Sequence, residues 1–391
     1  MIKITDKSKC CGCEACSQIC PKKCITMKPD EEGFMYPIVD ESICINCGLC
    51  EKTCPELNLQ ENKNPIDVFA AINPNAEIRL KSSSGGVFFY LAEKIINQGG
   101  AVIGACYDKN WRVKHEVAYT LDDVQKMRGS KYVQSRMNDV YLQTKKLLQN
   151  GIPVLFSGTS CQIMALKLFL NKEYDKLLAV ELICAGVPSP LLWSKYLKEE
   201  VYPKINSSQP SQEISNIEFR EKSKGWKNFR IVISSKRATT HIVSDFNYEN
   251  SFFSCVLKRA VQRYSCYSCP AKAGRSNSDI TLGDFWNYQS DDIIVDDDRG
   301  VSVVLANTEK GIHFLEGLTL TRREFGEVMM KNPASVKSGT CSVYRKNFYK
   351  RINHKSVREE MAFLKRHVLI RRIVNKLSLI HISEPTRRTP I

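Results

Sequence analysis

The sequence predicts a chain of two parts, a small cysteine-rich module at the N-terminus and a larger α/β domain with a mixed sheet behind it. Three observations lead to this fold class. The same four-cysteine run occurs twice between residues 10 and 54. Apolar segments with the periods of strands and helices alternate from residue 67 to about residue 200. From residue 214 to residue 243, longer segments of alternating polarity add further strands.

Both cysteine runs have the spacing C-x2-C-x2-C-x3-C-P, which is typical of proteins that hold a pair of 4Fe–4S clusters. Three closely spaced thiolates can wrap one cluster from a tight loop, while the fourth, fixed before a proline, reaches the other cluster. The spacing therefore assigns Cys10, Cys13, Cys16 and Cys54 to cluster one, and Cys20, Cys44, Cys47 and Cys50 to cluster two. The runs resemble the two-cluster bacterial ferredoxins over about residues 3–57. This resemblance implies an α+β ferredoxin-type domain at residues 1–57.

Zinc ribbons and disulfide frameworks also use paired cysteines. A zinc ribbon needs only four ligands for each ion and no further pair before a Cys-Pro step. A disulfide framework needs an oxidising compartment, and the first ten residues contain no apolar run of a signal peptide. Clusters are therefore the expected use of the two runs. Cys11 and Cys24 fall outside the register and are interpreted as bystanders.

The elements behind the first module follow in order. Residues 58–66 are polar, end in Asn64–Pro65 and are expected to be a linker. Residues 67–150 and 151–341 are expected to be the N-terminal and C-terminal parts of the α/β domain. Apolar segments predict strands at 67–73, 101–107, 153–156 and 177–183, with a turn at 157–160. Helical periodicity predicts helices at 87–97, 121–127, 137–149, 161–170 and 191–200.

Four further cysteines are placed where ligands of a third 4Fe–4S cluster would be. Cys161 lies at a predicted strand-to-helix turn, where a helix N-terminus favours the thiolate. Cys184 ends an apolar strand, and Cys266 and Cys269 form a C-x2-C pair before a proline. Since strand ends at one edge of an α/β sheet commonly build sites, we expect these four cysteines to bind that cluster.

Other interpretations of these cysteines stay open. Cys161 and Cys184 could be buried packing residues, and the C-x2-C pair could be a redox dithiol or half of a zinc site. Cys161 could also be a nucleophile, although no histidine outside the tail stands in a motif-like setting. The remaining cysteines lack paired context and are interpreted as packing residues: Cys106, Cys255 and Cys341.

A flavin is the usual converter between one-electron clusters and substrates that take electron pairs. The loop at residues 82–86, SSSGG, leads directly into a predicted helix, whose first N–H groups could cradle a flavin phosphate. A helix with an ordinary N-cap explains the loop nearly as well. Cationic Lys131 could hold a phosphate or a reduced flavin ring, and Asp284 beside Phe285 and Trp286 could shape a ring pocket.

The chain of 391 residues carries a net charge of +15, most of it near the C-terminus. Residues 342–391 hold 13 Lys or Arg against 3 Glu, which leaves only +5 for the rest. Residues 342–376 are expected to form a basic helical tail, either solvated or docked on a membrane surface or an acidic protein; nucleic acid is not an expected partner. Residues 377–391 contain LSLIHISEPTR, which looks like a translated sequencing adapter, so the native sequence is expected to end near Lys376.

No stretch approaches the roughly 20 apolar residues that a membrane span needs. The 17 cysteines favour a reducing compartment, so the protein is expected to be cytoplasmic.

Several segments together resemble a known family. They occur in the order SSSGGVFFYLAEKII, AVIGACYD, RGSKYVQS, GTSCQIMAL, ELICAGVPSP, YSCYSCP and SDITLGDFW. From about residue 67 to 340 they are similar to the beta-subunit family of the hydrogenases and dehydrogenases of the deazaflavin coenzyme (factor 420), which includes a chlorophyll-pathway reductase. The resemblance implies an FAD-dependent iron–sulfur oxidoreductase, with a fused ferredoxin module familiar in anaerobes. The flavin-site candidates that it implies are Ser83, Ser84, Gly85, Gly86 and Lys131.

The expected function is that of a cytoplasmic iron–sulfur flavoprotein. It would pass electrons between the ferredoxin-type module, FAD and a second redox cofactor or an organic substrate. The expected donor is a redox partner protein or reduced ferredoxin, while the acceptor and the catalytic residues are not indicated by the sequence. Many members of the family sit beside polysaccharide-synthesis genes, so polysaccharide biosynthesis is one context that the resemblance suggests. The alternative function is a non-catalytic electron-transfer adaptor that docks a partner enzyme.

Overall fold

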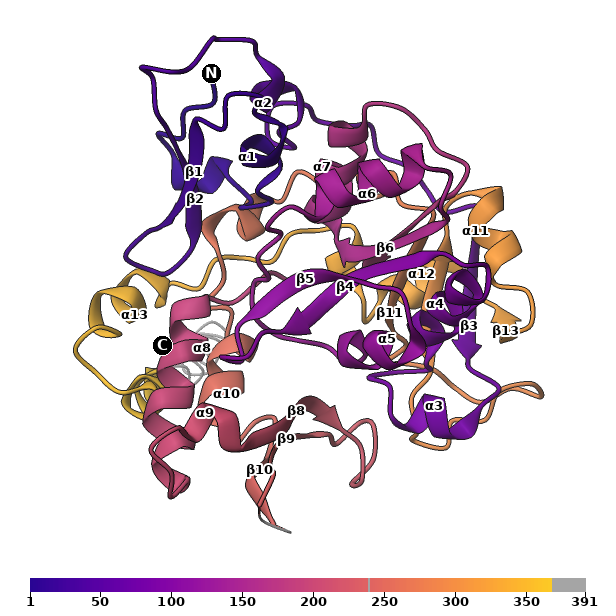
Figure 1. The fold of residues 1–391 in the computed structure, drawn as a ribbon. Helices are drawn as coiled ribbons and strands as arrows, with labels where there is room; N and C mark the ends of the chain where they lie inside the picture. Colours follow the sequence, from indigo (N-terminus) through magenta and orange to yellow (C-terminus); the bar gives the residue numbers. More distant parts are fainter. Residues whose placement is uncertain (238–239, 368–391) are drawn as a thin grey trace, which may run out of the picture.

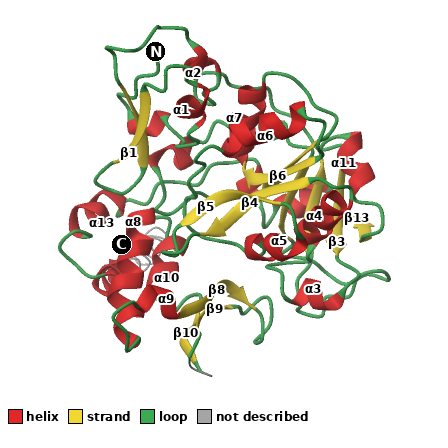
Figure 2. Cartoon of the chain, viewed as in Figure 1, coloured by secondary structure: helices red, strands yellow, loops and turns green. Residues whose placement is uncertain are grey.

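The computed structural model describes residues 1–237 and 240–367, and Figures 1 and 2 show its arrangement. The N-terminal module, indigo in Figure 1, is a small α+β unit in which an antiparallel hairpin lies beside two short helices. Its elements are η1 (Lys7–Lys9), α1 (Ala15–Ile19), β1 (Ile25–Pro29), β2 (Met35–Val39) and α2 (Leu49–Lys52). The predicted α+β class of this module is confirmed.

The larger domain is built on an eight-stranded mixed sheet, which confirms the predicted α/β class. Its strands are β3 (Asp67–Ile72), β4 (Ala101–Tyr107), β5 (Val113–Ala118), β6 (Val154–Thr159), β7 (Leu177–Leu182), β11 (Ile280–Asp284), β12 (Ser302–Ala306) and β13 (Thr319–Arg322). The order across the sheet is β13-β3-β12-β11-β7-β6-β4-β5. Strands β4, β6, β7 and β11 are mutually parallel, so their carboxyl ends meet at one edge.

Helices cover both faces of this sheet. They are α3 (Ala76–Leu80), α4 (Val87–Asn97), α5 (Leu121–Met127), α6 (Val140–Gln149), α7 (Ser160–Leu170), α11 (Glu309–Phe314) and α12 (Phe325–Met329). Successive strand residues point to opposite faces. Val102 and Leu155 therefore pack in the core with residues of α4 and α5, whereas Ile103 and Phe156 pack with residues of α6 and α7. Coverage of both faces is the reason that these parallel strands read as continuous apolar runs.

A second core joins the N-terminal module to elements that follow about residue 190. The remaining elements of this part of the chain are α8 (Pro190–Tyr196), η2 (Leu197–Val201), η3 (Tyr202–Lys204), α9 (Pro210–Glu213), β8 (Ile214–Glu221), β9 (Arg230–Ser235), β10 (His241–Phe246), α10 (Ser251–Leu257), η4 (Tyr264–Ser268), η5 (Pro333–Ser335) and α13 (Arg345–Arg351). Strands β10, β9 and β8 form a separate antiparallel sheet. Buried Phe34 and Tyr36 of the module belong to the same apolar cluster as Trp193 and Phe252.

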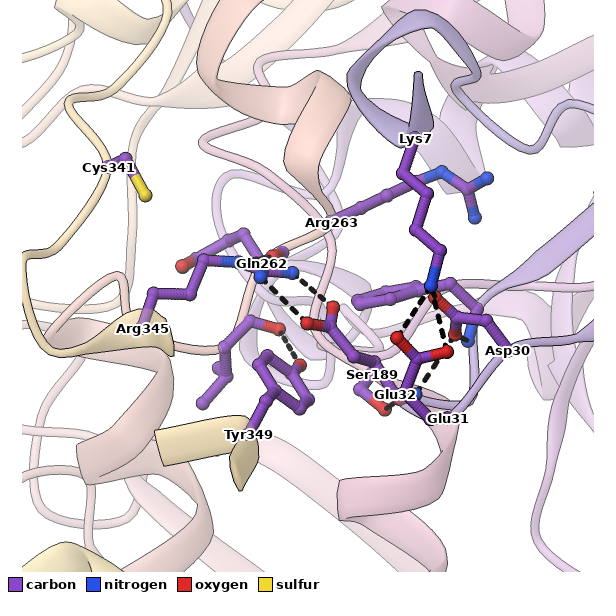
Figure 3. A network of polar contacts seen from close by, with 12 residues as sticks. Lys7, Asp30, Glu31, Glu32, Ser189, Gln262, Arg263, Cys341, Arg345 and Tyr349 are labelled. Carbon is purple, nitrogen blue, oxygen red and sulfur yellow. Dashed lines mark hydrogen bonds and ion pairs between the residues drawn. The ribbon is translucent and has the colours of Figure 1, made fainter. Parts of the chain in front are cut away.

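Buried polar contacts fasten the module to the C-terminal elements (Figure 3). Glu32, in the loop between β1 and β2, forms a two-pronged ion pair with Arg345 of α13, and the two side chains are only 8% and 1% exposed. The hydroxyl of Ser189 donates to the carbonyl oxygen of Glu32. Within the C-terminal elements, Tyr349 donates to the carbonyl oxygen of Val261 at 2.8 Å. Helix α1 also contacts α6 and α7. The module is therefore held against the α/β domain from two sides.

The structure corrects some predicted boundaries. The turn predicted at 157–160 is wrong, because β6 continues to Thr159 through its pairing with β7 and α7 begins at Ser160. The helix predicted from residue 137 begins at Val140. Strands β5, β11, β12 and β13 were not predicted. Strands β5, β11 and β13 mix polar residues with a few apolar ones, so pairing with neighbouring strands decides their conformation, whereas β12 contains a short apolar run.

The predicted basic tail folds back on the body over its described part. Phe348 and Ile352 are buried in the second core, and residues 357–367 are helical. The adapter-like residues 377–391, together with 368–376, lie outside the described residues. Within the described residues, no helix is long and apolar enough to cross a membrane.

Candidate metal and cofactor sites

The cysteines assigned to cluster two line one cavity at the outer end of the N-terminal module. Cys20, Cys44, Cys47 and Cys50 face about 350 Å³ of empty space, part of it open to solvent. The residues around this cavity all belong to the module. Cys24, interpreted from the sequence as a bystander, also lines it, with its sulfur 3.3 Å from that of Cys20.

The cysteines assigned to cluster one converge on the inner side of the module. Burial, followed by the negative charges of Cys10 and Cys54, raises the pKa of the Cys16 thiol well above its usual range. Burial also raises the pKa of Cys54, and Cys10 adds to it. Thiols that raise one another's pKa need a bound cation to stay ionised together, because ionised ligands repel until the metal binds. The loop can turn this tightly because Gly12 and Glu14 adopt left-handed backbone conformations, with φ of 68° and 64°.

The third group of cysteines comes together from segments far apart in the sequence. Cys161 lies in the first turn of α7, just after β6, and Cys184 follows the neighbouring parallel strand β7. Cys266 and Cys269 come from η4 and the residue after it. All four line a single cavity of about 380 Å³, part of it open to solvent. Backbone N–H groups of Gly186 and Val187 donate to the sulfurs of Cys184 and Cys266 at 3.3 and 3.4 Å.

Cys11 is a fifth cysteine in this third cavity, although the sequence suggested a bystander. It lines the same space as Cys161, and the two thiols are within hydrogen-bonding reach of each other. The amide of Gln134 donates to the carbonyl oxygen of Cys11 at 3.0 Å and holds this part of the loop. The sequence did contain a sign that Cys11 is special, because the second run has Ile45 at the position where the first run has this extra cysteine.

The cysteine sulfurs that line these cavities are suitable ligands for iron–sulfur clusters. Soft thiolates select iron–sulfur clusters or zinc. In the part of the chain that the structure describes, no group of three or more His, Cys, Asp or Glu side chains is placed to hold a single metal ion. Five cysteines line each of the two cavities, which is a sufficient set of donors for a 4Fe–4S cluster.

The two segments proposed for a flavin lie against each other. The hydroxyl oxygen of Ser83 accepts a hydrogen bond from the backbone N–H of Ser130 at 2.7 Å. Gly86 is the N-cap residue before α4, with φ of 87°, and no side chain caps the first N–H groups of this helix. Such groups attract an anion. The N–H of Gly85, however, already donates to the hydroxyl oxygen of Ser302, so it is not free for a phosphate.

Lys131 has partners within the chain. Its ammonium group donates to the carbonyl oxygens of Met127, Arg128 and Gly129 at 3.1 to 3.2 Å, and it lies 5.6 Å from the ring of Tyr107. These carbonyls include the C-terminal end of α5, where a cation is favourable. Burial lowers the pKa of Lys131 to about 8.

A cationic and aromatic cluster adjoins the Ser83–Gly86 loop, and the sequence did not indicate most of it. Arg220 on β8 pairs with Asp284 at 2.8 Å, and Trp226 stacks on Trp286 with ring centroids 4.9 Å apart. Lys222 donates to the carbonyl oxygen of Ser84 at 3.2 Å and to two further carbonyls. Phe285 points into an apolar cluster and is fully buried, so it does not shape an open ring pocket as predicted.

Comparison with known proteins identifies two regions of the chain. Residues 9–57 match the 4Fe–4S dicluster domain. Residues 153–325 match the family described as the C terminus of the coenzyme F420 hydrogenase/dehydrogenase beta subunit. These matches define an iron–sulfur electron-transfer protein of the oxidoreductase type. Residues 153–325 are thus similar to the C-terminal part of this beta-subunit family, and a dicluster domain lies in front of them.

Among solved structures, the chain is similar to one in the xenon-derivatised F420-reducing NiFe hydrogenase complex from Methanosarcina barkeri. The identity is 18%, the match covers 81% of this chain and 96% of that chain, and the TM-score is 0.44. No curated protein matches the chain.

Proposed function

We propose that the protein is an iron–sulfur flavoprotein oxidoreductase that collects electrons one at a time at its N-terminal module and delivers them inside the α/β domain. The observation that carries this proposal is the serial arrangement of the three cysteine groups. The cavity assigned to cluster two is lined only by the module and includes exposed Cys47. Cys10 of the next group and Cys11 in the third cavity are neighbours in the chain.

The route for electrons follows from this order. A redox partner protein, such as reduced ferredoxin, would dock at the outer end, where Ile43 and Ile45 are 49% and 57% exposed. From there electrons would move inward past Cys10 and Cys11 to the third cavity. A protein partner also agrees with the matched family, which is described as part of a hydrogenase or dehydrogenase with more than one kind of subunit.

FAD is proposed as the cofactor that would gather two electrons for a second cofactor or an organic substrate. The residues offered for it are Ser83, Ser84, Gly86 and Lys131. Uncapped N–H groups of α4 would face the phosphates, and Lys131 would contribute a positive charge nearby. The four cysteines Cys161, Cys184, Cys266 and Cys269 are proposed as ligands of a third 4Fe–4S cluster.

The adaptor alternative has one observation in its favour. Lys131 and the N–H of Gly85 already have partners inside the chain, as expected of a loop that binds no flavin. Flavin content separates the two functions, because an adaptor could lack it.

The test is a measurement of iron, sulfide and FAD per chain on one anaerobically purified sample. About twelve irons and one FAD support the proposal. About eight irons without flavin contradict it and favour the adaptor. The exposed end of the module would then be used to search for a partner enzyme.

A further inference from the structure

Arg263 is a fully buried cation between the N-terminal module and the α/β domain (Figure 3). Its guanidinium group makes four hydrogen bonds. Nε donates to the carbonyl oxygen of Cys10 at 2.5 Å, and Nη2 donates to the carbonyl oxygen of Met35 at 2.9 Å. Nη2 also donates to the sulfur of Cys10 at 3.4 Å, and Nη1 donates to Gln134 at 3.3 Å. The guanidinium carbon lies 4.1 Å from the centre of the Tyr36 ring.

The charge of Arg263 has no carboxylate partner within 4.0 Å among the described residues. Three other buried arginines are each paired: Arg345 with Glu32, Arg220 with Asp284 and Arg79 with Asp297. Glu56 lies near Arg263, but the two form no ion pair in the described part of the chain. A buried charge is costly unless an opposite charge compensates it. Among the described residues, the sulfur of Cys10 is the one ionisable hydrogen-bond acceptor of Arg263, so a negative charge held at that sulfur would compensate the buried cation.

We propose that Arg263 is the counter-cation of cluster one and holds its reduction potential up. The proposal rests on the assignment of Cys10 as a ligand of that cluster. One-electron reduction adds one negative charge to the site and requires no proton. A fixed positive charge and an N–H donor at a ligand sulfur stabilise that added charge, so the reduced state becomes easier to reach.

The position of Arg263 in the chain connects cluster one with the third cavity. The residue lies three positions before Cys266 and its carbonyl oxygen accepts from the N–H of Cys266 at 3.0 Å. Its own N–H donates to the carbonyl oxygen of Val187, next to the third cavity, at 3.1 Å. One residue thus contacts a ligand of cluster one and the backbone of the third site. Raising the potential of the inner cluster favours the movement of electrons from the module toward the α/β domain.

The test is a redox titration of the anaerobic full-length protein with dithionite, followed by electron paramagnetic resonance. In R263Q, we expect one of the module's two clusters to become at least tenfold harder to reduce, which is a fall of about 59 mV. The potential of the other cluster should not change. R263K keeps the charge but cannot reach all four acceptors, so its potential should fall by less than that of R263Q.

If Arg263 has a purely structural role, the reduction potential of cluster one should rise in R263Q instead of falling. Loosening the interface would admit water to the cluster, and water stabilises the reduced state and raises the potential. The matched control is E32Q/R345Q, which neutralises the other buried pair at the same interface without touching Cys10. An unchanged or raised potential in R263Q, with iron content intact, overturns the proposal. If R263Q yields no folded protein, R263K decides: a lowered potential supports the proposal, and an equal or higher one overturns it. Fewer than about eight irons in the wild type would instead show that the cluster assignment itself has failed.

Discussion

Removal of two thiols from the third cavity tests the central part of the proposed function. Five cysteines line that cavity, and C266S/C269S leaves three: Cys11, Cys161 and Cys184. A 4Fe–4S cluster needs four thiolate ligands, so the third cluster should not form in this variant. We expect the iron content to fall from about twelve to about eight per chain, with sulfide falling in proportion.

The controls for this experiment come from the same chain. C106S/C341S removes two cysteines that lie outside the cavity, and it should keep the full iron content. C11S should also keep it if the four predicted ligands are correct. Loss of about four irons in C11S would instead make Cys11 a ligand. Unchanged iron in C266S/C269S would refute the interpretation of this cavity as a cluster site.

Three further predictions concern stability and flavin binding. Burial lowers the pKa of His115 to about 4, and its Nδ1 has no hydrogen-bond partner, so folding favours the neutral ring. This preference for the neutral ring stabilises the fold fully above pH 6.5, and the stabilisation is lost as the pH falls toward 4. Between pH 7.5 and pH 5, the free energy of unfolding measured with urea should therefore fall by about 2 kcal/mol more in the wild type than in H115F. E32Q leaves the guanidinium of Arg345 buried beside a neutral partner and should cost roughly 3–5 kcal/mol, whereas a cost below about 1 kcal/mol in the same assay would contradict the importance of this pair. S83A removes the acceptor for the N–H of Ser130 and should weaken FAD binding about fivefold in a fluorescence titration, while an unchanged affinity would remove Ser83 from the flavin site.

Much of the secondary structure could be predicted because it depends on local pattern. Buried parallel strands such as β6 and β7 read as apolar runs, and α4 shows the period of a helix with one buried face. The short strand β11 carries no comparable pattern, whereas β12 contains a short buried apolar run at residues 303–306. They exist because each pairs with neighbours that come from distant parts of the chain. Asp284, which was predicted to border a ring pocket, is the last residue of β11.

The candidate sites, too, depend partly on local sequence and partly on contacts between distant residues. Spacing alone indicated the two N-terminal cysteine groups, since three of four ligands in each lie within one tight turn. Spacing could not reveal that Cys11 turns away from its neighbour Cys10 into another cavity. Lys131 looked free in the sequence, but the end of α5 accepts its hydrogen bonds.

The sequence by itself indicated a pair of clusters and an α/β domain, because ligand spacing and apolar periods are local properties, and it showed the resemblance to a redox family. Only the tertiary structure decided which residues meet between the two parts. Arg263 and Cys10 are 253 positions apart, and Glu32 and Arg345 are 313 apart. Such contacts depend on how two folded surfaces pack, since a buried charge finds its partner only when packing excludes water from both.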